Sequence, residues 1–519
     1  MPLLLRVAAA LVLLAGPLPA QQQPPPGFDA YVKRAMETFT VPGVAVAIVK
    51  DGKVVLAKGY GIRRMGDRAP VDAATLFGIA SNTKLFTATA LAILVEEGKL
   101  AWDRPVIDYL PAFAMSDPYV TRELTVRDLL VHRSGLGLGA GDLLWWPPST
   151  YDRKEIVRRI RYIPLATSFR SAYAYDNVLY LVAGEVIEAV SGVSWEEFVR
   201  SRILEPVGMS GSDVLHSSAA GPGNVAGTHA AVNDTVQPVA PFLSDNTNPA
   251  GGIMAGAADM AKWMIVQLDS GVVAPGDTLF RPGTARQLWT MVTPMNIGRP
   301  APELAPLMPN FNGYALGFNV KDYRGRKLVT HTGGLPGYIS RVAMIPELDL
   351  GVAVLTNMES AAMEPIYLRV LDHYLGAQHD WRSAWNAVIA RMDSANTAED
   401  AQAVASRDSS RGPSLPLERY AGTYRDAWYG DIVIAREGDG LTMRFGRTPL
   451  LFGDLVHWQF DTFLVRWRDR ELRADAYVSF ALAPDGSIAR ATMAPASPTV
   501  DFSFDFQDLE LKPVRDPGR

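Results

Sequence analysis

Residues 77–98 read FGIASNTKLFTATALAILVEEG, and the fold assignment starts from this stretch. The spacing of its apolar residues predicts a helix over 81–97, with Gly98 at the position of a helix stop. The helix opens on Ser81-Asn82-Thr83-Lys84, the only Ser-x-x-Lys in the chain. Residues three apart share a face of a helix, so Lys84 can reach the Ser81 hydroxyl.

A serine hydroxyl becomes a good nucleophile when a neighbouring base takes its proton. We expect the positive end of the helix dipole to lower the pKa of Lys84, as a general base requires. The alternative is an N-cap Ser81 followed by a solvated Lys84. This motif alone therefore does not establish a site.

A second candidate element is Tyr175-Asp176-Asn177, at the start of a helix predicted over 177–190. Tyr175 can share proton transfer with Lys84 if neighbouring cations favour its phenolate. The two-ended amide of Asn177 can hold Lys84 and a substrate carbonyl. Tyr-x-Asn is also common for purely structural reasons.

The third element is His331-Thr332-Gly333-Gly334, directly after a strand predicted over 326–330. Glycines let a backbone approach a substrate closely and direct its N–H groups at it. The alternative is an ordinary strand-end turn with a surface histidine.

Together and in this order, the three motifs resemble those of the serine β-lactamase and penicillin-binding-protein superfamily. The resemblance is to the branch of class C β-lactamases, D-Ala-D-Ala carboxypeptidases, D-aminopeptidases and related esterases, and it covers roughly residues 28–376. Further segments that resemble this branch are Phe77–Ala80, Thr125–Leu130, His132–Leu136, Glu205–Met209 and Pro249–Gly252.

The resemblance implies that Ser81 is acylated and that Lys84 and Tyr175 form the proton-transfer pair. Asn177 would orient Lys84 and the substrate, and the oxyanion would lie between the backbone N–H groups of Ser81 and Gly334. The substrate-binding residues would be Asn177, His331, Thr332, Gly333 and Gly334.

His331 stands where many relatives have lysine. We expect it to help bind a substrate carboxylate or to tune Tyr175. A mostly neutral imidazole suits the carboxylate of a β-lactam less well than a permanent cation, which weakens any inference of β-lactamase activity.

The order of predicted elements favours an α+β fold, because strands at both ends of residues 28–380 bracket a helical middle. The resemblance implies a β-lactamase/transpeptidase-like antiparallel sheet built from both termini, with a helical subdomain. The predicted strands are 44–50, 54–60, 314–320, 327–330, 341–345 and 351–356, and further helices are predicted over 28–38, 195–203 and 364–374.

The remaining chain divides into a polar linker, 381–414, and a β-rich segment, 415–519. Short alternating strands and frequent aromatic residues in that segment predict a small antiparallel β-barrel or sandwich with an aromatic core. It resembles the lipocalin-like domain of some peptidases and esterases, most closely at 420–424. We expect it to cap the active site or to mediate homo-oligomerisation.

Composition excludes several classes of function. The 519 residues include no cysteine, which excludes disulfides, thiolate metal sites and a catalytic thiol. The net charge is −5 without a basic patch, so nucleic acid is a poor candidate partner. No metal or cofactor is expected, and we expect the other six histidines to be surface or structural groups.

Residues 1–20 have the pattern of a signal peptide, with Arg6 before an apolar run and a cleavage position near Ala20. The protein is therefore expected to be secreted or periplasmic, without a stable membrane span. An uncleaved N-terminal anchor is the alternative.

These inferences predict a secreted serine hydrolase, either a peptidase or amidase or an esterase. The alternatives are a β-lactamase and a catalytically silent scaffold that binds cell-wall peptides or a partner protein. We expect the loops around 138–148 and 294–312 to line its cleft.

Overall fold

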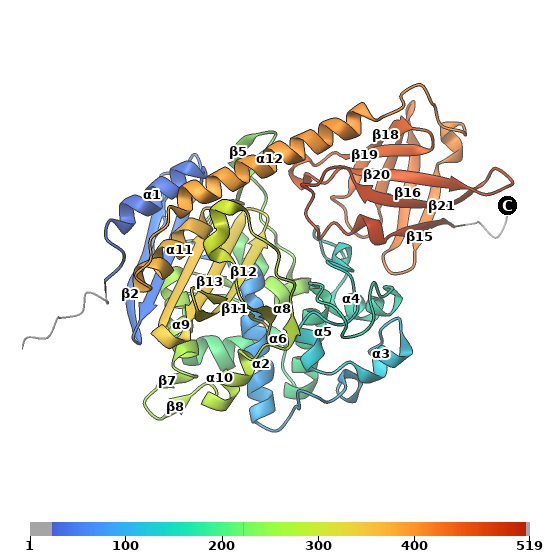
Figure 1. Cartoon of the computed structure of the whole chain (residues 1–519). Coiled ribbons are helices and arrows are strands. Elements are labelled where there is room, and N and C mark those ends of the chain that lie inside the picture. Colours follow the sequence, from blue (N-terminus) through green and yellow to red (C-terminus); the bar gives the residue numbers. More distant parts are fainter. Residues whose placement is uncertain (1–22, 222, 515–519) are drawn as a thin grey trace, which may run out of the picture.

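The computed structural model describes residues 23–221 and 223–514. The expected signal peptide lies outside this range. The described chain forms a large domain of helices and strands, a long helix and a smaller β domain, as Figure 1 shows.

An eight-stranded antiparallel sheet forms the centre of the large domain, in the order β2-β1-β14-β13-β12-β11-β10-β9. Strands from both ends of the domain meet where β1 pairs with β14, with Val46 opposite Val354. The predicted α+β class and the sheet built from both termini are confirmed. The strands are β1 (Gly43–Lys50), β2 (Lys53–Gly61), β9 (Thr293–Pro294), β10 (Asn312–Tyr314), β11 (Asn319–Tyr323), β12 (Arg326–Leu335), β13 (Tyr338–Ile345) and β14 (Leu350–Thr356).

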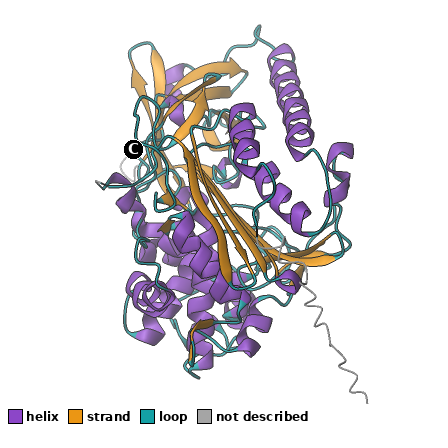
Figure 2. Ribbon diagram, turned by 90° about the vertical axis from the view of Figure 1, so that its left-hand side faces the viewer, coloured by secondary structure: helices purple, strands orange, loops and turns teal. Residues whose placement is uncertain are grey.

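The sheet separates two apolar cores, with helices on both of its faces (Figure 2). Every residue of β1 is buried, because alternate side chains of a strand point to opposite faces and both faces are covered. The even-numbered residues from Val44 to Ile48 enter one core, and the odd-numbered residues from Ala45 to Val49 enter the other.

The first core is covered by α1 (Phe28–Thr38), α11 (Met363–Tyr374) and the beginning of α12 (Trp381–Ala405). The second core contains the helical subdomain. Its helices are α2 (Thr83–Glu96), α3 (Pro118–Glu123), α4 (Arg153–Arg159), α5 (Val178–Ser191), α6 (Trp195–Val199), α7 (Glu205–Val207), α8 (Asn248–Gly251), α9 (Ala257–Leu268) and α10 (Pro282–Leu288). Short paired strands are β3 (Phe77–Gly78) with β6 (Met254–Ala255), β4 (His229–Val232) with β5 (Thr235–Pro238), and β7 (Val272–Ala274) with β8 (Asp277–Thr278).

Helix α2 lies in the middle of this subdomain. All its residues from Thr83 to Leu94 are buried, as is typical of a helix that is surrounded by other elements on every side. It packs against α5 and α8 on its way through the domain. The helix that carries Lys84 is therefore a core element and not a surface helix.

Two predicted elements differ from the structure. The strand predicted over 314–320 is a hairpin, because the chain reverses between β10 and β11 around Gly317, which has a φ of 81°. A Cβ at Gly317 would lie 2.9 Å from the carbonyl oxygen of Lys84, so the turn packs directly on α2. The helix predicted over 195–203 is α6 followed by a wider turn, Arg200–Leu204.

The segment predicted as a linker is mostly one continuous helix, α12, of 25 residues. Its first residue is fixed to the large domain, because the Trp381 indole N–H donates to buried Asp372 over 2.8 Å. Near its other end, Asp400 accepts a 3.1 Å hydrogen bond from Ser497 of the β domain. Beyond the helix, Arg407 donates to the carbonyl oxygen of Trp458 over 2.6 Å. In Figure 1 this helix spans the distance between the two domains.

The C-terminal domain is a closed eight-stranded barrel, which confirms the prediction of a small antiparallel β-barrel. Most of its aromatic residues fill the interior, but Phe502 is 41% exposed. Its likeness to lipocalins remains a prediction. The strands are β15 (Gly422–Asp426), β16 (Gly430–Glu437), β17 (Gly440–Phe445), β18 (Phe452–Gln459), β19 (Thr462–Trp467), β20 (Ala476–Leu482), β21 (Ile488–Pro495) and β22 (Glu510–Pro513).

Among the described residues, no single helix combines the length and hydropathy needed to cross a membrane. Helix α5 and the helical segment Trp195–Val207 have sufficient length and hydropathy when they are taken together, but this pair is bent by 77°.

Candidate active site

Ser81 lies in a tight turn, Ala80–Asn82, that leads directly into α2. The residue before it, Ala80, has a φ of 51°, a left-handed conformation that costs a non-glycine residue about 1 kcal/mol. Two hydrogen bonds of the preceding residue, Ile79, hold this turn in place. Ile79 donates its N–H to Ile253 over 3.0 Å and accepts a 2.7 Å hydrogen bond from Ser340 of β13.

Gly333 of β12 passes directly beside this turn. A Cβ at this position would lie 2.1 Å from the carbonyl oxygen of Ile79 and 2.6 Å from Oγ of Ser340, so only glycine fits. The sequence prediction that the glycines permit a close backbone approach agrees with this geometry. The next residue, Gly334, lines the cleft and carries the second N–H group expected to face an oxyanion.

Lys84 is completely buried, and its Nζ has three oxygen neighbours. It lies 3.0 Å from Oγ of Ser81, 2.7 Å from Oδ1 of Asn177 and 3.0 Å from the carbonyl oxygen of Ala250. Burial lowers the pKa of Lys84 to about 7, although Asp142 and Asp176 act in the opposite direction. The solvated-lysine alternative is wrong. The predicted direction of the pKa shift is right, but its main cause is burial and not the helix dipole.

The three contacts fit a neutral amine. Its two N–H groups can donate to Asn177 and Ala250, neither of which offers a donor at the contacting oxygen. The lone pair then points to the Ser81 hydroxyl and can accept its proton. A lysine of ordinary pKa would be protonated at neutral pH and could not do so.

Tyr175 also contacts Ser81, with its hydroxyl 2.9 Å from Oγ of Ser81. Burial raises the pKa of Tyr175 well above its ordinary value, and the carboxylates of Asp142 and Asp176 add to this effect. The condition set for a phenolate, neighbouring cations that favour it, is therefore not supported by the surroundings of Tyr175. Tyr175 is a neutral phenol that donates a hydrogen bond to the nucleophile.

Asn177 connects Lys84 to a buried carboxyl group. Its Oδ1 accepts from Lys84, and its Nδ2 donates to Oδ2 of Asp142 over 2.8 Å. Burial raises the pKa of Asp142 to about 7, against hydrogen bonds from Asn177, Trp145 and Ser503. The second hydrogen on Nδ2 of Asn177 is left for a substrate carbonyl. Sequence reasoning missed Asp142, whose one signal was its place in the predicted cleft loop.

His331 does not present a charge to the cleft. Burial, together with the nearby Lys84, lowers the pKa of His331 to about 3, so the ring is neutral. Its Nε2 lies 2.6 Å from the Tyr314 hydroxyl and its Nδ1 lies 2.5 Å from the carbonyl oxygen of Thr332. Both ring nitrogens are engaged, so a substrate carboxylate would have to replace one of these partners. That His331 helps bind such a carboxylate or tunes Tyr175 stays a prediction. The ring of His331 lies 6.4 Å from that of Tyr175, without a hydrogen bond between them in the described structure.

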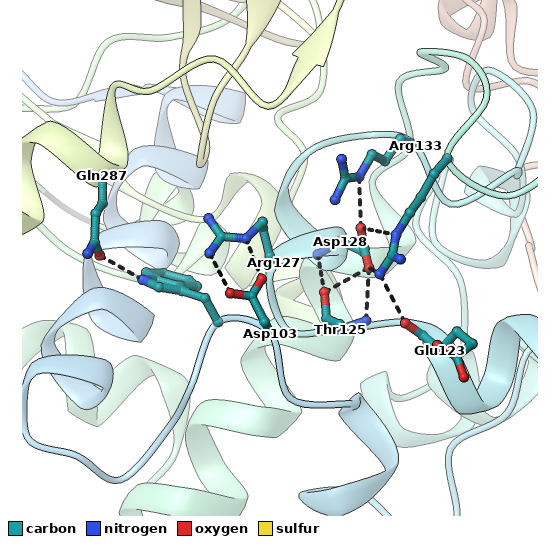
Figure 3. A network of polar contacts seen from close by, with 9 residues as sticks. Asp103, Glu123, Thr125, Arg127, Asp128, Arg133 and Gln287 are labelled. Carbon is teal, nitrogen blue, oxygen red and sulfur yellow. Dashed lines mark hydrogen bonds and ion pairs between the residues drawn. The ribbon is translucent and has the colours of Figure 1, made fainter.

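The ring of His132 packs against the ring of Tyr175. His132 is buried, its ring centroid lies 4.3 Å from that of Tyr175, and its Nδ1 accepts the N–H of Asp176. The preceding segment is held by buried Asp128, which accepts hydrogen bonds from Thr125, Arg133 and Arg170 (Figure 3). His132 is thus a structural group, as expected, but one that touches the site.

Ser81 lies in a cleft of about 920 Å³. Its walls include Leu138 and the run Trp145–Pro148, as predicted, and from the second predicted loop Met295 and Asn312. The barrel also contributes, with Phe502 among its lining residues. Within residues 23–221 and 223–514, no group of three or more His, Asp or Glu side chains is arranged to hold a metal ion.

Residues 28–375 match the family model for Beta-lactamase. The chain belongs to the serine β-lactamase and penicillin-binding-protein superfamily. Residues 406–513 of the chain match a second family model, which is described as a domain of unknown function, DUF3471. This match covers the barrel.

Two relatives and two solved structures illustrate this membership. This chain is 29% identical over 440 residues to unguisins hydrolase ungD of Aspergillus violaceofuscus. The alignment covers 78% of this chain and 75% of the relative. It is 25% identical over 346 residues to protein flp of Staphylococcus aureus, covering 66% of this chain and 64% of the relative.

Among structures, an octameric penicillin-binding protein homologue from Pyrococcus abyssi aligns with a TM-score of 0.58 at 24% identity, over 94% of this chain and 99% of the other. A D-stereospecific amidohydrolase from Streptomyces aligns with a TM-score of 0.53 at 22% identity, over 66% of this chain and 97% of the other. At these identities the two structures show the shared fold.

The buried amine of Lys84 has a consequence for stability. An unfolded Lys84 binds a proton up to pH about 10.5, whereas the folded one releases it near pH 7, so the unfolded state binds more protons between these values. Its contribution to stability therefore rises with pH across this window, by about 1.4 kcal/mol per pH unit. The raised pKa of Asp142 acts below pH 7, outside the window.

We expect the free energy of unfolding of the wild type, measured relative to Lys84→Met, to increase by about 3 kcal/mol between pH 7.5 and 9.5. Denaturant titrations at the two pH values measure the difference. Lys33→Met removes an exposed lysine and should leave the wild-type pH dependence intact. Parallel pH profiles for wild type and Lys84→Met would contradict a neutral buried amine.

Proposed function

We propose that this chain is a serine hydrolase that acts through an acyl-enzyme on Ser81, in the class C β-lactamase-related branch. One observation carries the proposal: Oγ of Ser81 lies within 3.0 Å of a buried lysine amine and 2.9 Å of a neutral tyrosine hydroxyl. A base and an acid that both contact the nucleophile are the two groups that acyl transfer requires.

Acylation follows from these positions. Oγ of Ser81 attacks the substrate carbonyl carbon while its proton passes to Nζ of Lys84. The negative charge that develops on the carbonyl oxygen is stabilised by the backbone N–H groups of Ser81 and Gly334. The bond to the leaving group then breaks, and the leaving atom takes a proton from the Tyr175 hydroxyl, which regains one from Lys84.

Deacylation runs the same steps with water. Lys84, again neutral, takes a proton from the attacking water, directly or through the Tyr175 hydroxyl. The ester bond to Ser81 breaks, and Oγ of Ser81 recovers a proton from the protonated Lys84, which returns to its neutral form. Because Tyr175 is a phenol in the resting state, Lys84 is the group that holds the transferred proton in both halves of the reaction.

The charges around the cleft support an amide or peptide substrate over a simple ester. Lys321 and Arg341 line the cleft from the sheet, and Asp501, Glu471 and Arg473 line it from the barrel domain. Arg341 is paired with Glu364, and Arg473 with Glu359. The Nε atom of Arg341 is buried without a hydrogen-bond partner in the described structure. A substrate that carries both an anionic and a cationic group, as a peptide does, complements such a cleft.

Two alternatives are less well supported. A β-lactamase would gain from a fixed cation at position 331, where the structure has a neutral imidazole. A catalytically silent scaffold would have no need to keep Lys84 buried in a neutral form against Ser81.

Ser81→Ala should lose activity by a factor of at least about 10⁴, because the covalent step disappears. The assay compares wild type and variant on p-nitrophenyl esters, D-amino-acid amides, D-Ala-D-Ala peptides and nitrocefin. A fluorophosphonate probe should also label wild-type Ser81, read by peptide mass spectrometry. Activity that survives in Ser81→Ala would overturn the mechanism, and a folded wild type that stays unlabelled would favour the scaffold.

Tyr175→Phe should separate the two kinds of substrate. An amine leaving group needs the proton of Tyr175, whereas p-nitrophenolate leaves without one. We expect kcat/KM to fall by roughly 10²–10³ on amides and by less than about tenfold on p-nitrophenyl esters. Tyr119→Phe, at an exposed position, is the matched control. Equal losses on both substrates would show that Tyr175 is not the acid for the leaving group.

We further propose that the chain is exported and that cleavage falls near Ala20. This rests on the charge and hydropathy pattern of residues 1–20. Mass spectrometry of the protein recovered from its native host should find an N-terminus at or close to Gln21, and an intact Met1 would favour the uncleaved anchor. Oligomerisation through the barrel also remains a proposal.

A further inference from the structure

A segment of the barrel between β21 and β22 enters the active-site cleft. The ring of Phe502 stands perpendicular to that of Tyr175 with 6.1 Å between their centroids. Its carbonyl oxygen approaches Gly139 so closely that a Cβ there would lie 2.7 Å away. Ser503 and Asp505, which follow, are both buried.

Asp505 fixes the loop that carries Asp142. Its two carboxyl oxygens accept the backbone N–H groups of Gly141 over 2.7 Å and of Leu143 over 3.0 Å. These two amides flank Asp142 in the chain. A side chain of the barrel therefore determines where the backbone of Asp142 lies.

Ser503 contacts the side chain of Asp142 itself. Its hydroxyl donates to Oδ2 of Asp142 over 2.9 Å, and the same oxygen accepts from Asn177 over 2.8 Å. Asn177 in turn holds Nζ of Lys84 at 2.7 Å. An unbroken chain of hydrogen bonds thus runs from the barrel to the base.

We propose that Ser503 and Asp505 are positioning residues through which the C-terminal barrel orients Asp142, Asn177 and Lys84 for the reaction at Ser81. The inference rests on the proposed hydrolase function and deepens it. The barrel is then a part of the catalytic apparatus and does more than cover the cleft.

The charges around Asp142 and Lys84 determine in which direction the loss of the Ser503 hydroxyl shifts their pKa values. Asp142 faces Lys84 from α2 and Asp505 from the barrel. Lys84 faces Asp142 and Asp176, the rings of Tyr175 and Tyr180, and the two histidines His132 and His331, whose pKa values are both lowered by burial.

The Ser503 hydroxyl favours the ionised form of Asp142, and ionised Asp142 raises the pKa of Lys84. Loss of that hydroxyl leaves Asp142 protonated over a wider pH range. The pKa of Lys84 then falls, and its amine is neutral at lower pH.

In the full-length protein we expect Ser503→Ala to reduce kcat by about tenfold, the kinetic equivalent of one hydrogen bond to a charged group. The acidic limb of its kcat/KM profile should move to lower pH by roughly 0.3–0.5 of a unit. Ser503→Thr keeps the hydroxyl and should restore both values. Ser497 lies in the same segment, but its hydroxyl donates to Asp400 of α12 and not to a residue of the site. Ser497→Ala should therefore have the kcat and pH profile of the wild type.

A second variant tests the backbone contact. Asp505→Asn keeps the size of the side chain but places an amide nitrogen against the N–H of Gly141 or Leu143. We expect kcat to fall at least as far as in Ser503→Ala, with less change in KM.

Wild-type kinetics and pH profiles in folded Ser503→Ala and Asp505→Asn would overturn the inference. So would equal losses in Ser503→Ala and Ser497→Ala, since these would indicate general damage to the barrel. If the wild type itself is inactive and unlabelled at Ser81, the proposed function fails, an outcome distinct from active wild type with unaffected variants.

Discussion

The structure depends on keeping the amine of Lys84 out of water. A buried ammonium is costly, so burial releases its proton and turns the side chain into a base. This requires protein on every side of one position near the start of α2. The closed environment comes from α5, from the turn around Gly317 and from the Ala250 backbone, and the contacts with Asn177 and Ala250 also fix the direction of the amine. The many buried apolar residues around α2 offset the cost of placing a polar group there.

Much of the site could be predicted from the sequence, because three motifs in a particular order contain the residues that meet at Ser81. The apolar runs within 44–50 and 351–356 similarly predicted the central strands. Local sequence patterns do not show how deeply a side chain is buried in the fold, however, and burial decides the protonation states of Lys84 and Tyr175. For this reason the helix dipole was not the main cause of the lowered pKa of Lys84, and the sequence left open whether Tyr175 is a phenol or a phenolate. The hairpin at Gly317 was missed because its two short strands flank the turn with apolar residues on both sides.

The residues that sequence reasoning missed share another property. Asp142 and its partner Ser503 are 361 positions apart. No motif joins them, because the barrel folds from its own segment and meets the large domain only through tertiary packing. The buried apolar residues of the two domains nevertheless form one continuous cluster. The two family models, 28–375 and 406–513, divide the chain where its sequence changes character, whereas the site extends across both.

Helix α12 gives this arrangement a geometric restriction. A helix of 25 residues is about 37 Å long, and each residue added or removed shifts its end by about 1.5 Å and rotates it by about 100°. Because both ends of α12 are attached, its length determines the rotation of the barrel about the helix axis as well as the distance between the two domains. A single insertion would turn the barrel away from the cleft, and only changes close to whole turns would keep it in register. The connector between these domains is thus free to vary in sequence along its exposed middle, whereas its length can change only in steps close to whole helical turns.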